Sequence, residues 1–510
     1  MKKVWITLAL CALCGCSTTY WRNDADKEVG RILTRKNADV KSEPVPPYAR
    51  TSDSTAPETV FLTLKDALIT AAKNNRTYQT TKENVYLAAL NLTYQRYLYR
   101  PRFTIGGDVG WNKNGGESVY GDVDFGLIYW LANGAQLTAG FTQSFFKYLT
   151  GDKSKSVSNV VSLNLLQPFF QGAGRDIALE DLVQAERDVV YQIRSFLRYQ
   201  RSFSVDVAGE YFTVLLAKNT RENYWDNYVF LKNTRERIEM LAQAGRIATF
   251  QADQASQNEY SGYQSWVAAV NDYNQLLDNF KINLGLAPAV PLVLDEKGLE
   301  SFFTRGVPPV KFNASEYVQK ALEARLDLMN TYDAIDDAVR QAKVAANNLR
   351  TQLNLNLGFD NTGAYAAGLT FNLPTDMIPE RNAYRSALIS LDRAKRQFDQ
   401  AKDQVKLDVI NSGRDLEETY QSYLIQKISL DLASKRVEST GLLLQAGRAD
   451  TRDLLDSQSS YLSARNALSS AIVKYLNDTL DFLQSAEMLD LDDQGVWKGD
   501  LYEKISGETP

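Results

Sequence analysis

Two aspartates follow a short phrase that this sequence contains twice. Residues 443–458 read LLQAGRADTRDLLDSQ and residues 241–256 read LAQAGRIATFQADQAS, so both copies hold Gln-Ala-Gly-Arg with a Thr four residues after the Gly. Asp453 and Asp456 in the later copy lie where the earlier copy has glutamines. Their i, i+3 spacing places both carboxylates on one face of a helix. Carboxylates in this arrangement could attract cations at a pore, or serve as the acid and base of a glycoside hydrolase.

The composition excludes several other kinds of chemistry. The 510 residues include no His, which removes the commonest general base and the commonest metal ligand. A net charge of −5 offers no basic excess for nucleic acid or for an anionic membrane surface. No GxxxxGK[ST] loop is present, so nucleotide hydrolysis is not expected. We predict no cofactor, no metal site and no enzymatic activity, because the two aspartates lie in a helical pattern without pocket-forming loops.

The N-terminus reads MKKVWITLALCALCGCSTT and is typical of an export signal. Two lysines precede an apolar run that is too short to span a bilayer as a mature helix. The run ends in Leu-Cys-Gly-Cys, which resembles a bacterial lipoprotein signal over residues 1–15. Such a signal leaves Cys16 as a lipidated N-terminus that carries acyl chains such as palmitate, and Ser17 after it favours transfer to the outer membrane. The alternative is an ordinary secretory signal that contains cysteines.

Two blocks have the period-2 alternation of β-strands. Across residues 102–167, Phe, Ile, Val, Trp and Leu alternate with polar or small residues, and Gly and Asn punctuate the block. Residues 351–374 alternate in the same way around a short turn near Gly363. One apolar face rich in Tyr, Trp and Phe suits a membrane interface. Any membrane crossing is therefore predicted to use strands, since no other apolar run reaches the roughly 18 residues of a transmembrane helix.

Long helical patterns alternate with these blocks. A period of 3.6 residues, with Thr63 as the first N-cap, predicts helices at about 63–99, 176–244, 249–284, 314–350, 381–446 and 451–487. The order helix, strands, very long helix, Gly break, helix occurs twice, so we predict an internal two-fold repeat. The predicted organisation is a signal peptide at 1–15, an extended lipidated linker at 16–60, a first repeat at 61–285, an equatorial connector at 286–313, a second repeat at 314–488 and a tail at 489–510.

These elements need partners. A helix of about 100 Å with an apolar stripe is not stable alone, so coiled-coil packing is predicted along its length. Strands from one chain do not close a barrel, and an open sheet edge does not persist in lipid. Several chains are therefore expected to contribute strands to one symmetric ring.

With these features the mature chain resembles, over nearly its whole length, the TolC-type outer-membrane efflux proteins (the outer membrane factor family), in particular its lipoprotein branch. LTLKDALITAAKNNRTYQ resembles that family's first helix, QPFFQGAGRDIALEDL its strand-to-helix junction, and the two QAGR phrases its periplasmic tip turns. The resemblance implies a mixed α+β membrane protein that forms a homotrimer. Three chains would build one 12-stranded transmembrane β-barrel, continuous with a long periplasmic α-helical coiled-coil tunnel.

The resemblance also gives roles to residues near the two turns. Asp453 and Asp456 match the acidic periplasmic gate, where six carboxylates from three chains would raise one another's pKa values and attract cations. Gln251 and Gln254 stand at the equivalent places of the first repeat, so a second acidic ring is absent or shifted. The turn residues expected to meet an adaptor are Gly245, Arg246, Thr249, Gly447, Arg448 and Thr451. The alternative for the two aspartates is that they are ordinary solvated surface acids. The alternative for the Arg and Thr residues at the turns is that they only cap helices.

We expect an outer-membrane channel, the exit duct of a tripartite efflux or type I secretion system. It would be lipid-anchored in the cell outer membrane, extend into the periplasm and conduct substrates passively. Its expected partners are two further copies, a periplasmic adaptor (membrane fusion) protein, an inner-membrane transporter of RND, ABC or MFS type, and outer-membrane lipid, with no nucleic acid. The alternative is a lipid-anchored structural coiled-coil protein that spans the periplasm without an open channel.

Residues 119–146 exceed what two strands require. They could form a hairpin that extends above the membrane, lengthen the barrel strands, or add strands to the barrel. The sequence alone leaves these three placements open.

Overall fold

The computed structural model describes residues 18–40, 60–113, 117–150, 155–309, 313–361, 363–373, 376–492 and 495–497. They divide into two compact units. The first contains Asn84–Arg194, Asp327–Ala401 and the described N-terminal residues, and the second contains the described parts of Tyr48–Glu83, Ser195–Leu326 and Lys402–Pro510. The division falls within α4 (Arg76–Leu98), α6 (Glu180–Gln243) and α11 (Ile378–Gln445), and after the first residue of α10 (Leu326–Asn347).

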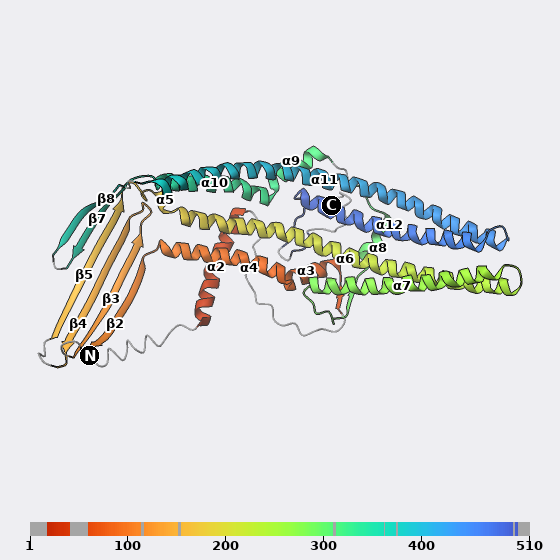
Figure 1. Ribbon diagram of the computed structural model, residues 1–510, viewed down its shortest axis with the longest axis horizontal. Coiled ribbons are helices and arrows are strands. Elements are labelled where there is room, and N and C mark those ends of the chain that lie inside the picture. Colours follow the sequence, from red (N-terminus) through yellow and green to blue (C-terminus); the bar gives the residue numbers. More distant parts are fainter. Residues whose placement is uncertain are drawn as a thin grey trace. The chain divides into compact units, whose positions relative to one another are not determined.

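One antiparallel sheet of six strands dominates the first unit (Figure 1). Its strands lie in the order β2 (Arg102–Asn112), β3 (Ser118–Trp130), β4 (Gln136–Tyr148), β5 (Lys155–Pro168), β7 (Gln352–Asp360) and β8 (Tyr365–Asn372). A 12-stranded ring of three chains would use four strands from each, whereas this sheet has six. The two additional strands are β3 and β4, formed by the segment around residues 119–146, which take full places in the sheet between β2 and β5.

Alternation gives the sheet one apolar and one polar face, as the sequence predicted. On the apolar face, Phe103 and Ile105 of β2 are 77% and 75% exposed, and Leu369 of β8 is 67% exposed. The opposite face carries polar and small residues such as Asp108 and Asn356. The described residues therefore leave the apolar face uncovered, which a water-soluble sheet would avoid.

A helix, α2 (Thr18–Val40), also belongs to the first unit. The extended linker predicted for residues 16–60 is therefore wrong at residues 18–40. Tyr86 of α4 donates a hydrogen bond to the carboxylate of Asp26 in α2. The helix buries a short apolar stripe made by Val29, Ile32 and Leu33. Their i, i+3, i+4 spacing is a helical signal, but the polar composition around it concealed the stripe.

Ion pairs join the helices that follow and precede the sheet in the first unit. A short helix, α5 (Arg175–Ala178), leads from β5 to α6, and α10 (Leu326–Asn347) leads to β7. Arg340 Nε of α10 lies 2.9 Å from Glu180 Oε1 of α6, and Arg187 Nη1 of α6 lies 3.0 Å from Asp337 Oδ1 of α10. These side chains are mostly shielded from solvent and share several hydrogen bonds, so they contribute more than isolated surface pairs.

The second unit is mainly helical. Its remaining elements are α3 (Leu64–Asn74), α7 (Thr249–Asn283), α8 (Lys297–Arg305), α9 (Ala314–Ala324), α12 (Thr451–Ser485) and a parallel pair of short strands, β1 (Val60–Leu62) and β6 (Leu292–Leu294). Its core holds fully buried aromatic side chains, including Tyr211, Phe280, Tyr475 and Phe482. No helix in the described ranges has a stretch that is both long and apolar enough to cross a membrane.

Two helices that the sequence predicted as continuous are each split by one extended residue. Thr63 caps α3 as predicted, since its Oγ1 accepts a hydrogen bond from the Asp66 N–H at 3.2 Å. Asn75 then interrupts the run between α3 and α4, and Arg325 interrupts the next one between α9 and α10. Their φ, ψ angles, −64°, 126° and −66°, 118°, break the i→i−4 ladder without a Pro or Gly. Asn75 also caps α4, since its Oδ1 accepts the Tyr78 N–H at 2.9 Å.

Candidate functional site

The repeated phrase forms the same helix-ending turn at both places, and both turns lie at one end of the second unit (Figure 1). The Gly245 N–H donates to the Ala242 carbonyl at 3.0 Å, and the Arg246 N–H donates to the Leu241 carbonyl at 2.9 Å. At the second turn, the N–H groups of Gly447 and Arg448 donate to Leu444 and Leu443 at the same two distances. This is the Schellman pattern, which requires a left-handed residue, and both glycines have φ of 69°. The phrase therefore encodes a helix reversal, as predicted.

The helices that follow the two turns correspond closely. Helices α7 and α12 contain 35 residues each, and Thr451 begins α12 202 residues (451 − 249) after Thr249 begins α7. The two helices also meet near their starts, where the Thr451 hydroxyl donates to Gln251 Oε1 at 2.9 Å. The side chain of Gln251 therefore fastens α7 to α12, in a position where the later phrase has an aspartate.

Both predicted gate aspartates are exposed on the first turns of α12. A carboxylate oxygen of Asp453 accepts the Asp450 N–H at 3.1 Å, so this side chain also caps the helix. Asp456 lies 3.8 Å from Arg452, and its side chain is 63% exposed. An exposed pair at this distance contributes little to stability. The geometry leaves the charge of Asp456 available to solvent and gives Asp453 a structural role in addition.

The other predicted turn residues divide into exposed and buried ones. Arg246, Thr249 and Arg448 are exposed, so their side chains are accessible to another protein. Thr451, in contrast, is fully buried, and its hydroxyl is used by Gln251. Because it is buried, Thr451 is placed to support the turn and not to contact a partner protein directly.

Polar side chains that the sequence analysis did not single out connect α6 to α12. Gln458 Nε2 donates to Asn227 Oδ1 at 3.0 Å, and one turn earlier in α6 Asn223 Nδ2 donates to Asn466 Oδ1 at 2.7 Å. Asn223, Asn227 and Gln458 are buried. Buried amide pairs between helices fix which residues lie opposite one another, because a shift by one turn would leave them without partners. The signal available in the sequence was the spacing of Asn223 and Asn227, which places both on one face of a helix.

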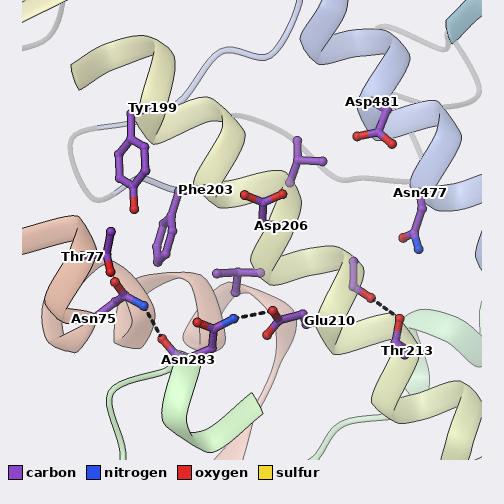
Figure 2. Close-up of a pocket in the computed structure, with 13 residues that line it drawn as sticks. Asn75, Thr77, Tyr199, Phe203, Asp206, Glu210, Thr213, Asn283, Asn477 and Asp481 are labelled. Carbon is purple, nitrogen blue, oxygen red and sulfur yellow. Dashed lines mark hydrogen bonds between the residues drawn. The ribbon is translucent and has the colours of Figure 1, made fainter. Parts of the chain in front are cut away.

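A polar cavity of about 520 Å³ lies farther from the turns in the second unit (Figure 2). Asp206 and Glu210 of α6 and Asp481 of α12 line it, and no Lys or Arg is among the lining residues. Asn283 Nδ2 donates to the Glu210 carboxylate, and Asn75 Nδ2 donates to the Asn283 carbonyl at 2.7 Å.

The surroundings of this cavity favour neutral carboxyl groups. Burial raises the pKa of Asp206 and of Glu210, and the negative charge of Asp206 adds to the rise at Glu210, while the bond from Asn283 opposes it. Burial, together with the charges of Asp478 and Asp206, raises the pKa of Asp481 to about 6. Asp481 can therefore exchange protons close to neutral pH.

A comparison within the sequence could have found this cavity. Asp408 lies 202 residues after Asp206, and Arg325 Nη1 lies 3.0 Å from the carboxylate of Asp408. The helix break at Arg325 corresponds to the break at Asn75, where the side chain is uncharged. Asp408 therefore has a cationic partner at its helix break, whereas the corresponding break holds the uncharged Asn75 and offers Asp206 no cation.

The predicted lipidation residue, Cys16, lies outside the described residues.

Comparison with protein families and with curated proteins found no match. Solved structures do match in fold. A structure of CusC, described in terms of folding and transmembrane channel formation, aligns with a TM-score of 0.62 at 14% identity, covering 87% of this chain and 99% of that chain. The outer membrane protein VceC of Vibrio cholerae aligns with a TM-score of 0.61 at 13% identity, covering 83% of this chain and 95% of that chain.

The open state of the MtrE outer membrane channel of Neisseria gonorrhoeae gives a TM-score of 0.59 at 14% identity, covering 83% of this chain and 88% of that chain. These alignments cover most of each chain, and at 13–14% identity they show a shared fold. The chain therefore has the fold of the outer-membrane channels to which TolC-type proteins belong, as its resemblance to them predicted.

Proposed function

We propose that this chain is an outer-membrane exit duct, through which substrates pass passively from a periplasmic adaptor and an inner-membrane pump to the outside. The observation that carries the proposal is the sheet with one uncovered apolar face and one polar face, in a chain with an outer-membrane channel fold. Such a sheet is stable when its apolar face meets lipid and its polar face lines water. The chain's own chemistry would be that of a conduit and not of an enzyme.

The proposed assembly is a homotrimer, with a β-barrel in the outer membrane continuous with a coiled-coil tunnel. Exposed apolar side chains along both helical hairpins support it, among them Val229 and Val267 on α6 and α7, and Ile425 and Ile428 on α11. Neighbouring copies would cover these positions, since a long helix gains most of its stability from packing. An internal duplication is the simplest account of the two equal turns and the two 35-residue helices.

The proposed partners follow from this assembly. The exposed Arg246 and Arg448 beside the turns would meet a periplasmic adaptor, which would join the duct to an inner-membrane transporter of RND, ABC or MFS type in a tripartite efflux or type I secretion system. Cys16 would carry acyl chains and hold the N-terminus in the outer membrane. The type of transporter, and with it the cargo, would be set by the partners.

The carboxylates of Asp453 and Asp456 are proposed to form the periplasmic gate. Both are exposed after the second turn, and three copies would bring six carboxylates together. Gln251 occupies the position after the first turn that matches Asp453 and is engaged by Thr451, so this position would contribute packing and no carboxylate. Only one acidic ring is then expected, which would attract cations and repel anions.

Single-channel recording in a planar bilayer tests both the duct and its gate. Wild-type protein should form small cation-selective pores that a trivalent cation blocks. The Asp453→Asn, Asp456→Asn double variant should lose selectivity and block, while Asn retains an oxygen acceptor for the cap at Asp450. Asp431→Asn is the matched control, because Asp431 is an exposed acid of α11 that pairs with Lys435 at 2.7 Å, away from the turns. Unchanged selectivity in the double variant would remove the gate from these residues and leave the channel.

The alternative function, a lipid-anchored coiled-coil spacer without a lumen, predicts a different result. A spacer held only by its acyl chains should become soluble when Cys16 is replaced by Ser and export is directed by an ordinary signal. A duct with a membrane-inserted sheet should still require detergent. Absence of pores together with solubility after this change would favour the spacer.

A further inference from the structure

The sheet contains two more strands than the predicted 12-stranded ring of three chains requires. The additional pair, β3 and β4, stands between β2 and β5. β3 pairs with β2 over 11 residues and with β4 over 13, and β4 pairs with β5 over 12, in each case residue by residue without a bulge. β3 and β4 have 13 residues each, which is longer than the roughly 9–11 residues that a tilted strand needs to cross a bilayer.

The apolar and polar faces continue through the additional strands. One cross-strand row runs through Ile105, Phe125, Phe141 and Val161, from β2 to β5. The rings of Phe125 and Phe141 are in contact, with centroids 6.0 Å apart.

The neighbouring row points to the other face. It consists of Gly106, Asp124, Thr142 and Val160, and the Thr142 hydroxyl donates to Asp124 Oδ1 at 2.6 Å. A hairpin that stood in water above a membrane would have no reason to keep an apolar face in register with its neighbours. The pattern therefore fits strands that share the environment of β2 and β5.

The turn between β3 and β4 is built into the junction between sheet and helices. Asn133 Nδ2 donates to Gln167 Oε1 at 2.8 Å, and the Gly174 N–H donates to the Asn133 carbonyl at 3.1 Å. Gly134 has φ of 92°, and a Cβ at this position would lie 2.3 Å from the carbonyl oxygen of Gly172. Because the turn packs against the segment between β5 and α6, the hairpin is fixed at the same end of the sheet where the long helices begin.

The two edge strands fit each other. In an antiparallel sheet of six strands the first and last run in opposite directions, so β8 of one copy can pair antiparallel with β2 of the next. Within the described residues neither edge is covered by another strand. The occupant that satisfies both edges at once is a further copy of this chain, because it brings the complementary edge and the same two faces.

We propose that three copies close through β8–β2 pairing into an 18-stranded barrel; this inference rests on the proposed homotrimer. With strands about 4.8 Å apart and tilted about 40°, a 12-stranded barrel measures about 24 Å across between backbones and an 18-stranded one about 36 Å. Barrels of 16–18 strands leave an aqueous channel. The outer exit of this duct is then of porin width, lined by the polar face with Asp108, Asp122 and Asp124.

Cysteine labelling of the trimer in lipid vesicles tests the proposal. The only cysteines of the sequence lie within the first 16 residues, so introduced thiols are easily distinguished. Asp124→Cys and Thr142→Cys should react with a water-soluble maleimide through the lumen. Their immediate neighbours, Phe125→Cys and Phe141→Cys, should react at least about tenfold more slowly, because such a reagent does not enter hydrocarbon. The pair Gly106→Cys and Ile105→Cys on β2 is the control, since every arrangement places β2 in the barrel.

The outcomes separate this inference from the proposed function. Equal, fast labelling of Phe125→Cys and Phe141→Cys in a protein that is a trimer by mass, with the β2 control still face-dependent, overturns the 18-stranded barrel and leaves the duct intact. Absence of a trimer overturns both. Images of the wild-type complex need no variant and give a second measurement. Eighteen strands around the wall support the proposal, and twelve refute it.

Discussion

Asp481 should make the stability of this protein depend on pH between about 4 and 6. The folded chain raises its pKa from 3.8 to about 6 through burial and the nearby charges of Asp478 and Asp206. A carboxyl group whose folded-state pKa is raised stabilises the fold while it is neutral. That contribution is fully present below the unfolded pKa and is lost as pH rises through the folded pKa. Replacing Asp481 with Asn should therefore stabilise the protein at neutral pH and have no effect at pH 3.5.

The magnitude follows from the shift. A difference of about 2 pKa units corresponds to about 3 kcal/mol of the free energy of unfolding if the site were closed to water. Asp481 is only partly buried and remains open to solvent at the cavity, so screening reduces the expected gain at pH 7.5 to about 1 kcal/mol. For a chain of this size that gain is about 1 °C in the unfolding temperature.

Thermal unfolding of the purified protein in detergent, at one scan rate and at pH values from 3.5 to 8, measures this difference. The gap between Asp481→Asn and wild type should open between pH 4 and pH 6.5 and then stay constant. Asp431→Asn, the exposed variant on α11, should leave the wild-type pH dependence in place. A gap of equal size at every pH would refute the reasoning, because the effect would then come from packing or hydrogen bonding and not from the proton.

Three further substitutions test one glycine turn and two contacts between helices by their effect on the free energy of unfolding. Gly447→Ala should cost about 1–2 kcal/mol, because φ is 69° while nothing lies within 4 Å of the added Cβ, and Gly447→Asn should cost less. Arg325→Met should cost about 2–3 kcal/mol, since it leaves the partly buried Asp408 carboxylate without its cationic partner, and Arg325→Lys should recover part of the loss. Thr451→Val should cost about 1 kcal/mol by removing a buried hydrogen bond, whereas the exposed Thr249→Val should be close to neutral.

The elements that the sequence predicted well are those with a local signal. The apolar period, the Thr63 cap and the two QAGR phrases marked helix starts and ends closely, because capping and the left-handed turn act within a few residues. The break at Asn75 also has a local part, because Asn75 Oδ1 accepts the Tyr78 N–H at 2.9 Å and so caps α4. Its other contact, from Asn75 Nδ2 to the Asn283 carbonyl, reaches more than 200 residues along the sequence, and no local pattern contains it.

The number of strands and the polar cavity depended on pairing between distant segments. Residues 119–146 alternate correctly for strands, but alternation does not state whether a hairpin extends a sheet or leaves it. The answer came from the contact of Gly134 with Gly172 and the bond from Asn133 to Gln167, which fix the hairpin at the junction. Likewise, the raised pKa of Asp481 comes first from burial, with added contributions from Asp478 on its own helix and from Asp206 on another helix.

The proposed wide exit and the proposed acidic gate have separate consequences for transport. A barrel of 18 strands has about 2.25 times the cross-section of one with 12, because diameter grows in proportion to strand number. Resistances in series add, so the narrowest segment sets the ion conductance of a tube. If Asp453 and Asp456 close the narrow end, widening the other end changes the conductance of small ions very little. The additional hairpin would then matter for bulky cargo, which a narrow exit would stop, and bilayer recording with small ions would report on the duct and its gate but not on the width of the barrel.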